Sequence, residues 1–160
     1  VVGFPLGAST METKRFEAMK AIADGAHEID MVINLSAVKS NEWNDVKDDI
    51  TSLVRVTHQQ GALLKVILET ALLTNEEKKR VSQLSEEAGA DFIKTSTGFS
   101  TSGATVDDIR LMRECTQNIA IKASGGIKDY KTALQMIQAG ATRLGTSSSV
   151  EIMKESPISD

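Results

Sequence analysis

Residues 61–94 read GALLKVILETALLTNEEKKRVSQLSEEAGADFIK, and this stretch contains one complete strand and helix unit. A Gly-Ala pair precedes an apolar run. The pattern Thr74-x-x-Glu77 then fits the capping box, in which two side chains satisfy the free backbone amides at a helix start. A second Gly-Ala pair, Gly89-Ala90, fits a helix end and precedes the next apolar run. The stretch therefore predicts a β/α unit.

Gly-Ala pairs also occur before and after this unit, at Gly25-Ala26 and Gly140-Ala141. Ser9-x-x-Glu12 predicts another helix start. Alternating strands and helices imply a parallel sheet covered by helices, either an open doubly wound sheet or a β/α barrel. Strands are expected at about residues 29–34, 63–69, 91–96, 119–123 and 143–146, with Val1 to Phe4 as the tail of a sixth.

Apolar residues at three- and four-residue steps predict helices that each bury one stripe. Two such stripes are Phe16, Met19 and Ile22, and Trp43, Val46, Ile50, Leu53 and Val54.

Composition limits the class of protein. The 160 residues suit one domain, 1–160, and a formal charge of −4 offers no basic surface for nucleic acid. No apolar run approaches the roughly 18 residues of a membrane span. The single cysteine, Cys115, cannot form an internal disulfide, so a reducing compartment, the cytosol, is expected.

Side chains alternate across a strand, and one face of the predicted strands is uniformly apolar. The opposite face carries ionisable side chains from four strands: Asp30, Lys65, Glu69, Lys94 and Lys122. If the sheet closes, this face becomes a barrel interior, where unpaired charges cost several kcal/mol. We therefore expect these residues to be paired or functional. In β/α barrels the chemistry lies at the carboxyl ends of the strands, where Glu69, Lys94 and Lys122 fall.

Two neighbouring lysines have a specific chemical use. An amine must be neutral to attack a carbonyl, and an ordinary lysine is almost entirely protonated at pH 7. Like-charge repulsion at about 4 Å, with an effective dielectric near 20, is of order 4 kcal/mol, enough to favour a neutral amine. Such a pair suits Schiff-base chemistry, with Asp30 available to move protons.

Glycines and serines after the last two predicted strands indicate a phosphate site. Gly125-Gly126 follows the Lys122 strand, and Gly145 to Ser149 follows the next strand and opens a helix. His27 and His58 lie at helix ends and are expected at the surface, and Cys115 is expected to pack on a helix. No His, Cys or carboxylate cluster has metal-ligand spacing and no dinucleotide fingerprint occurs, so neither a metal nor a nucleotide cofactor is expected.

Four motifs together closely resemble the deoxyribose-phosphate aldolase family. They are Glu28-Ile29-Asp30-Met31-Val32, Leu64-Lys65-Val66-Ile67-Leu68-Glu69-Thr70, Phe92-Ile93-Lys94-Thr95-Ser96-Thr97-Gly98, and Ile121-Lys122-Ala123-Ser124-Gly125-Gly126. They occur in the family's order and spacing, and the resemblance covers essentially the whole chain.

The resemblance implies a class I aldolase on a β/α barrel that reversibly splits 2-deoxy-D-ribose 5-phosphate into acetaldehyde and D-glyceraldehyde 3-phosphate without metal. Lys94 would form the Schiff base. Lys122 would favour the neutral form of Lys94 and share a proton relay with Asp30. Thr95 and Thr97 would line the pocket. The phosphate would be held by Gly125, Gly126, Ser147 and Ser148.

The family's barrel has eight strands, and this chain resembles about six of the eight β/α units, beginning within the third. One hypothesis is therefore an aldolase, alone or completed by association. The alternative is an inactive, self-associating barrel fragment that keeps the site residues. Because six parallel strands would leave two open edges, a homo-oligomer is expected, and two-fold pairing, the commonest closed symmetry, predicts a dimer.

Overall fold

The computed structural model describes residues 1–157, so residues 158–160 of the expected single domain lie outside the described residues. Five parallel strands follow one another in sheet order, each paired with the next. The strands are β1 (Glu28–Val32), β2 (Leu63–Ile67), β3 (Phe92–Lys94), β4 (Ala120–Ser124) and β5 (Arg143–Gly145).

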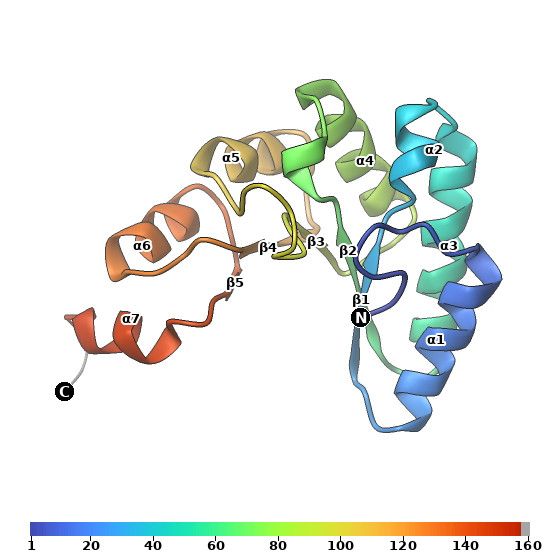
Figure 1. Cartoon of the computed structure of the whole chain (residues 1–160), viewed down its shortest axis with the longest axis horizontal. Helices are drawn as coiled ribbons and strands as arrows, with labels where there is room; N and C mark the ends of the chain where they lie inside the picture. The colour runs from blue at the N-terminus through green and yellow to red at the C-terminus, as the bar shows by residue number, and fades with distance from the viewer. Residues whose placement is uncertain (158–160) are drawn as a thin grey trace.

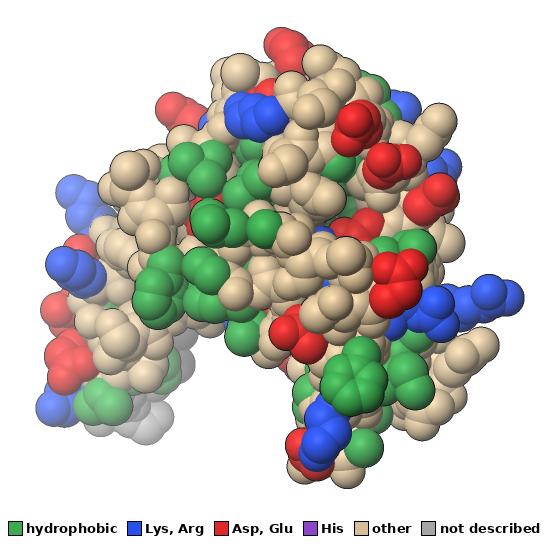
Figure 2. Space-filling model, turned by 45° about the vertical axis from the view of Figure 1, so that its right-hand side comes forward, with side chains coloured by type: hydrophobic (Ala, Val, Ile, Leu, Met, Phe, Trp, Pro, Cys, Tyr) green, Lys and Arg blue, Asp and Glu red, His purple; other side chains and the backbone are tan. Residues whose placement is uncertain are grey.

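Helices connect the strands and cover one face of the sheet, so that they form an outer arc around the strands (Figure 1). They are α1 (Met11–Ala23), α2 (Leu35–Lys39), α3 (Trp43–Gln59), α4 (Asn75–Glu87), α5 (Val106–Glu114), α6 (Tyr130–Gln138) and α7 (Ser149–Glu155), with a 3-10 turn at Thr70–Leu72. The predicted β/α alternation is confirmed. Figure 2 shows that one side of the molecule is hollowed between two lobes.

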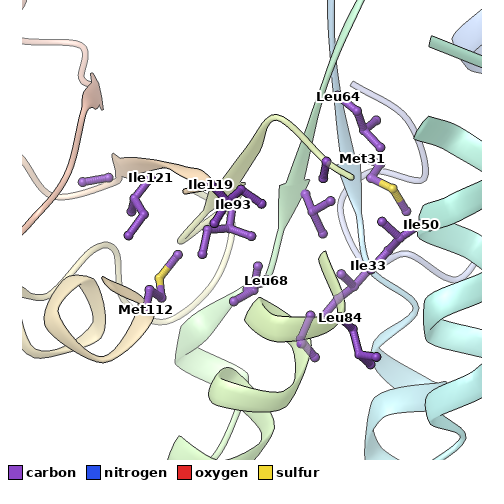
Figure 3. Packing of buried hydrophobic residues seen from close by; sticks show 14 of the residues in the cluster. Met31, Ile33, Ile50, Leu64, Leu68, Leu84, Ile93, Met112, Ile119 and Ile121 are labelled. Atoms are coloured by element: carbon purple, nitrogen blue, oxygen red, sulfur yellow. The ribbon is translucent and has the colours of Figure 1, made fainter. Parts of the chain in front are cut away.

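The core lies between the strands and the helices, as the strand alternation predicted (Figure 3). The residues in the strands, or next to their ends, that face the helices are all buried: Ile29, Met31, Ile33, Leu64, Val66, Leu68, Ile93, Ile119 and Ile121. From α3, the predicted stripe supplies Val46, Ile50 and Leu53 to this core, with Trp43 and Val54 packed partly buried against it. This arrangement leaves the opposite, polar face of the strands free to form a site.

The helix-end predictions are largely confirmed. Thr74 accepts a hydrogen bond from the Glu77 amide and Glu77 returns one to the Thr74 amide, which completes the capping box of α4. Gly25, Gly61, Gly89 and Gly140 all have positive φ and each is the second residue after a helix. Glycine adopts this conformation without a steric penalty.

Three predictions at the amino-terminal end are wrong. The cap of α1 is Thr10, whose hydroxyl accepts from the Thr13 amide, in place of Ser9. In α1 the predicted apolar stripe also fails, because Phe16 is 72% and Met19 55% exposed. The buried residues of this helix are Lys14 and Ala18.

The third correction concerns the expected sixth strand at Val1 to Phe4. Only Val2 joins the sheet, through a single parallel bridge to Met31. Gly3 has a φ of +60°, which turns the chain out of an extended path. Lys14 fills the space beside Gly3 and forms a buried ion pair with Asp49 on α3. That pair explains why α1 buries a lysine in place of its aromatic residue.

Candidate functional site

The ionisable residues of the polar strand face come together on neighbouring strands. Asp30 on β1 is opposite Lys65 on β2, and Lys94 on β3 is opposite Lys122 on β4. Because the strands are parallel and sequential, the register stacks these side chains on one face of the sheet. The sheet is also strongly curved, so that β5, at the far edge from β1, still reaches it: the Nη1 atom of Arg143 lies 2.6 Å from Oε2 of Glu28.

Asp30 is the centre of this cluster. Its Oδ1 accepts from the Nζ of Lys65 at 2.7 Å, and its Oδ2 accepts from the Nζ of Lys94 at 2.7 Å. The Nζ of Lys122 lies 3.8 Å from the same Oδ2. The structure therefore brings the three predicted catalytic residues, Asp30, Lys94 and Lys122, to within ion-pair distance around one carboxylate.

Burial alone would raise the pKa of Asp30, because a carboxylate is less well solvated inside the protein. Hydrogen bonds from Lys65 and Lys94 and the charges of both lysines outweigh this effect and lower the pKa of Asp30 to about 2. Asp30 is thus a carboxylate at neutral pH, suited to orient and balance positive charge.

The pKa of Lys122 is shifted in the direction that favours the neutral amine. Burial is the largest cause, and the positive charges of Lys94, Lys65 and Arg143 add to it, while Asp30 opposes them; the net effect is a lowered pKa for Lys122. A lysine with a lowered pKa can give up and regain a proton more readily near neutral pH. Lys122 is therefore suited to exchange protons beside Lys94.

Glu69 and Thr97 fix the loop that follows β3. Glu69 is 2% exposed and has a φ of +55°. Its carboxylate accepts from both the amide and the hydroxyl of Thr97. This contact holds Thr97 at the rim of the site, directly after the Lys94 strand.

Thr95 is buried behind the pocket and is not one of its lining residues. It is fully buried, and its hydroxyl donates to the Ser124 carbonyl and accepts from the Ser124 amide, both at 3.1 Å. Thr95 thus ties the end of β3 to the end of β4, below the surface that a ligand would touch.

A pocket of about 320 Å³ opens at the carboxyl ends of β3, β4 and β5. Its lining residues are Lys94, Ser96, Thr97, Gly98, Lys122, Ser124, Gly125, Gly126, Ile127, Lys128, Gly145, Thr146 and Ser147. The two lysines of the cluster therefore share one cavity with the glycine pair and Ser147. Ser148 lies one residue beyond the lining, where its amide donates to the Thr146 hydroxyl at 2.9 Å and where α7 begins.

The glycine pair forms a turn in a backbone conformation that favours glycine. Gly125 and Gly126 have φ values of +86° and +79°. Gly103 packs directly on this loop, since a Cβ atom at Gly103 would lie 2.2 Å from the Gly125 carbonyl oxygen. Lys128, two residues after Gly126, adds a positive charge to the lining.

Sequence reasoning missed Glu28, Arg143, Lys128 and Thr146. Signals for two of them were present, because Glu28 is two residues before Asp30 and therefore shares its strand face. Arg143 begins the expected strand 143–146, where alternation places it on the face opposite the apolar Leu144. Lys128 and Thr146 lie in loops, where no alternation rule applies.

A larger hollow of about 790 Å³ lies at the amino ends of the strands and has a different chemistry. Its lining includes the acidic residues Glu86, Glu87 and Asp91. None of the lysines around Asp30 lines it. The carboxylate of Glu86 is already used by the amides of Gln117, Asn118 and Ile119. We therefore assign the functional site to the smaller pocket.

The remaining predicted residues lie outside this pocket. His58 pairs with Asp91 at 2.9 Å, His27 is exposed, and Cys115 ends α5 half-buried. Burial raises the pKa of the Cys115 thiol, which disfavours a thiolate. Within residues 1–157, no group of three or more His, Cys, Asp or Glu side chains is placed to hold a metal ion, and no helix is long and apolar enough to cross a membrane.

Comparison with known proteins matches residues 4–153 to the DeoC/LacD family aldolase. A deoxyribose-phosphate aldolase of Thermococcus kodakarensis is 55% identical over 158 residues, which are 98% of this chain and 70% of that protein. One of Clostridium tetani is 55% identical over 98% of this chain and 72% of its own length. The chain thus spans about 70% of the length of these curated relatives.

Solved structures agree with the sequence relatives. A tetrameric deoxyribose phosphate aldolase from Aeropyrum pernix superposes with a TM-score of 0.87 at 34% identity, covering 96% of this chain and 64% of that chain. The described fold therefore corresponds to a major part of an aldolase barrel.

Proposed function

This chain belongs to the DeoC/LacD aldolase family, and we propose that it is a class I aldolase that reversibly splits 2-deoxy-D-ribose 5-phosphate into acetaldehyde and D-glyceraldehyde 3-phosphate. The observation that carries the proposal is one carboxylate, Asp30, that contacts both Lys94 and Lys122 beside a glycine-lined pocket. The reaction makes this protein a lyase.

Lys94 is the proposed nucleophile. Its neutral amine attacks the C1 aldehyde of the open-chain sugar, and loss of water leaves an iminium ion. Cleavage of the C2–C3 bond then sends its electron pair into the iminium to form an enamine, while the C3 hydroxyl loses its proton and becomes the aldehyde of glyceraldehyde 3-phosphate. Protonation of the enamine at C2 and hydrolysis release acetaldehyde and restore Lys94.

Asp30 and Lys122 have different proposed roles because they differ in charge and in how their pKa values are shifted. Asp30, with a pKa of about 2, stays ionised and stabilises the positive iminium formed at the position of the Lys94 nitrogen, 2.7 Å away. We assign it this role in place of the proton relay with Lys122 that the family resemblance implied. Lys122, with its lowered pKa, exchanges the protons that move between hydroxyl, water and C2. Thr95 supports this arrangement by joining β3 to β4, and Thr97 lines the pocket rim.

The phosphate is assigned to the side of the pocket formed by Gly125, Gly126 and Ser147. Backbone amides of Gly125 and Gly126 approach an anion without a side chain in the way, and Ser147 and Ser148 add polar groups at the start of α7. The Lys128 ammonium offsets part of the phosphate charge. This wall and Lys94 line the same cavity, as a single phosphorylated substrate requires.

The inactive barrel fragment is the less favoured alternative. Three cations around one carboxylate beside a pocket cost desolvation energy, and in a fragment with no turnover nothing in the reaction would offset that cost. The 55% identity to named aldolases also supports the enzymatic proposal. We further propose that the protein is a homo-oligomer, a dimer. The free thiol of Cys115 supports the proposal that it is cytosolic.

A cleavage assay tests the proposed function. The purified chain is given 2-deoxy-D-ribose 5-phosphate or unphosphorylated 2-deoxy-D-ribose, and acetaldehyde release is followed. We expect turnover of the phosphorylated sugar and much weaker turnover of the free sugar. Equal rates would contradict the phosphate assignment, and absence of acetaldehyde from both sugars would support the inactive fragment.

A further inference from the structure

A chain of ion pairs crosses the concave face of the sheet and ends at Asp30. It begins on β5, where Arg143 contacts Oε2 of Glu28 at 2.6 Å. The same Oε2 lies 2.7 Å from the Nζ of Lys65, and that Nζ also contacts Oδ1 of Asp30 at 2.7 Å. Arg143, Glu28 and Lys65 are thus connected to the proposed reaction centre without lining its pocket.

Lys65 is the shared member of this chain. Its side chain is 4% exposed, and its ammonium is divided between two carboxylates, those of Glu28 and Asp30. The two carboxylates therefore compete for one buried cation. Arg143 reduces that competition, because it supplies Glu28 with a second cation on the same oxygen.

Arg143 is itself held in place. Its guanidinium carbon lies 4.5 Å from the centre of the Phe92 ring on β3, a cation–π distance. The contacts with the Phe92 ring and with Glu28 together hold the guanidinium beside the Glu28 carboxylate.

We propose that Arg143 and Glu28 are positioning residues, which act through Lys65 to hold Oδ1 of Asp30 so that Oδ2 faces Lys94 and Lys122. This inference rests on the proposed function, because it assigns the chain of ion pairs to the same reaction. Without Arg143, Glu28 draws Lys65 toward itself, and the Asp30 carboxylate loses the contact that fixes its rotation. Lys94 then loses its aligned partner.

The charged groups that face Asp30 come from every strand of the sheet. They are Glu28 on its own strand β1, Lys65 on β2, Lys94 on β3, Lys122 on β4 and Arg143, through Glu28, on β5. Weaker contact with Lys65 leaves Asp30 with less positive charge around it, so the pKa of Asp30 should rise from about 2.

A rescue experiment separates this role from a purely structural one. We compare Arg143→Gln with the double variant Glu28→Gln/Arg143→Gln, and use Arg110→Gln as control, because the ion pair of Arg110 with Asp107 on α5 is exposed at the surface. The measurements are the rate at which Lys94 is trapped by acetaldehyde and borohydride, and the titration of the Asp30 carboxyl carbon by NMR. Circular dichroism checks the fold of each variant.

We expect Arg143→Gln to slow trapping at saturating acetaldehyde by about tenfold or more, with little change in the half-saturating concentration. The NMR titration midpoint of Asp30 should rise in the same variant. Neutralising Glu28 in the double variant removes the competitor for Lys65, so both properties should return toward wild type.

The inference is overturned if Arg143→Gln leaves the Asp30 titration as it is in Arg110→Gln, or if the double variant is no better than Arg143→Gln alone. Failure of the proposed function looks different: wild-type protein would then give no adduct at Lys94. In that case the Asp30 titration, which requires no turnover, still decides whether Arg143 acts on Asp30.

Discussion

Asp30 holds three cations with two oxygens, and its charge therefore matters for stability as well as for the reaction. Its folded pKa, about 2, lies below the ordinary value of 3.8. The ionised carboxylate thus stabilises the folded protein fully above about pH 4. This contribution is lost as the pH falls from about 4 through about 2.

Asp30→Asn should lower the free energy of unfolding at pH 7 by about 2 kcal/mol, because it leaves Lys65 and Lys94 without their shared anion. The difference from wild type should shrink between about pH 4 and about pH 2. Urea unfolding at several pH values measures this. Asp48→Asn, at an exposed position of α3, is the control and should leave the free energy nearly unchanged. A difference that stays constant with pH would contradict the charge argument.

Lys122→Met should shift the formation of the Lys94 adduct to higher pH. In the wild type, Oδ2 of Asp30 lies 2.7 Å from the Nζ of Lys94 and 3.8 Å from that of Lys122, so the substitution removes a positive charge beside Lys94. The pH profile of borohydride trapping measures the shift, with Lys79→Met on the surface of α4 as control. An unchanged profile would show that Lys122 activates Lys94 in some way other than by its charge.

At the scale of elements, the pocket depends on two loops that touch. Gly103, in the connection between β3 and α5, packs against the backbone of Gly125. A methyl group at Gly103 would lie 2.2 Å from the Gly125 carbonyl oxygen, which forces one loop to move.

Gly103→Ala should therefore weaken the use of phosphorylated substrate more than the trapping of acetaldehyde. The Michaelis constant for 2-deoxy-D-ribose 5-phosphate should rise about tenfold, while the Lys94 adduct with acetaldehyde forms at nearly the wild-type rate. Ser102→Ala, one residue earlier and exposed, is the control. Equal loss in both assays would mean that the displaced loop disturbs the lysines and not the phosphate wall.

The elements that sequence reasoning predicted well are those in which one physical rule dominates. Strand alternation placed Ile29, Met31 and Leu64 in the core and Asp30 and Lys94 on the other face. The capping box at Thr74 required only local hydrogen bonds.

The errors arise where distant partners override local pattern. Periodicity in α1 favoured burial of Phe16, but Asp49 on α3 provides an anion for Lys14, and the helix turns that lysine inward. The link between Glu28 and Arg143 spans 115 residues, so only the curvature of the sheet reveals it. No local rule contains that information.

At the scale of the whole molecule, the five strands form an arc in which β1 and β5 are the two edges (Figure 1). Figure 2 shows hydrophobic side chains across the middle of one face. Large apolar side chains are exposed on several elements, among them Phe99 at 78%, Met153 at 63% and Val150 at 60%. Edges and apolar surface of this kind favour association.

We therefore expect sedimentation equilibrium to give a mass at least twice the 17.2 kDa of the chain at micromolar concentration. Dilution should cause dissociation together with loss of far-ultraviolet dichroism. The reason is that the folded chain is stable only while another copy covers the edges of its sheet. A monomer that stays folded on dilution would contradict the proposed assembly.

The proposed reaction depends on which lysine forms the Schiff base. The chain is incubated with acetaldehyde, reduced with borohydride, digested and mapped by mass spectrometry, alongside Lys94→Arg. Arginine keeps a positive charge beside Asp30 but cannot form the imine, so it separates the nucleophile from the ion pair. We predict an N-ethyl group on Lys94 in the wild type and none at this position in the folded variant. An adduct on Lys122 or Lys65, with Lys94 unmodified, would contradict the account.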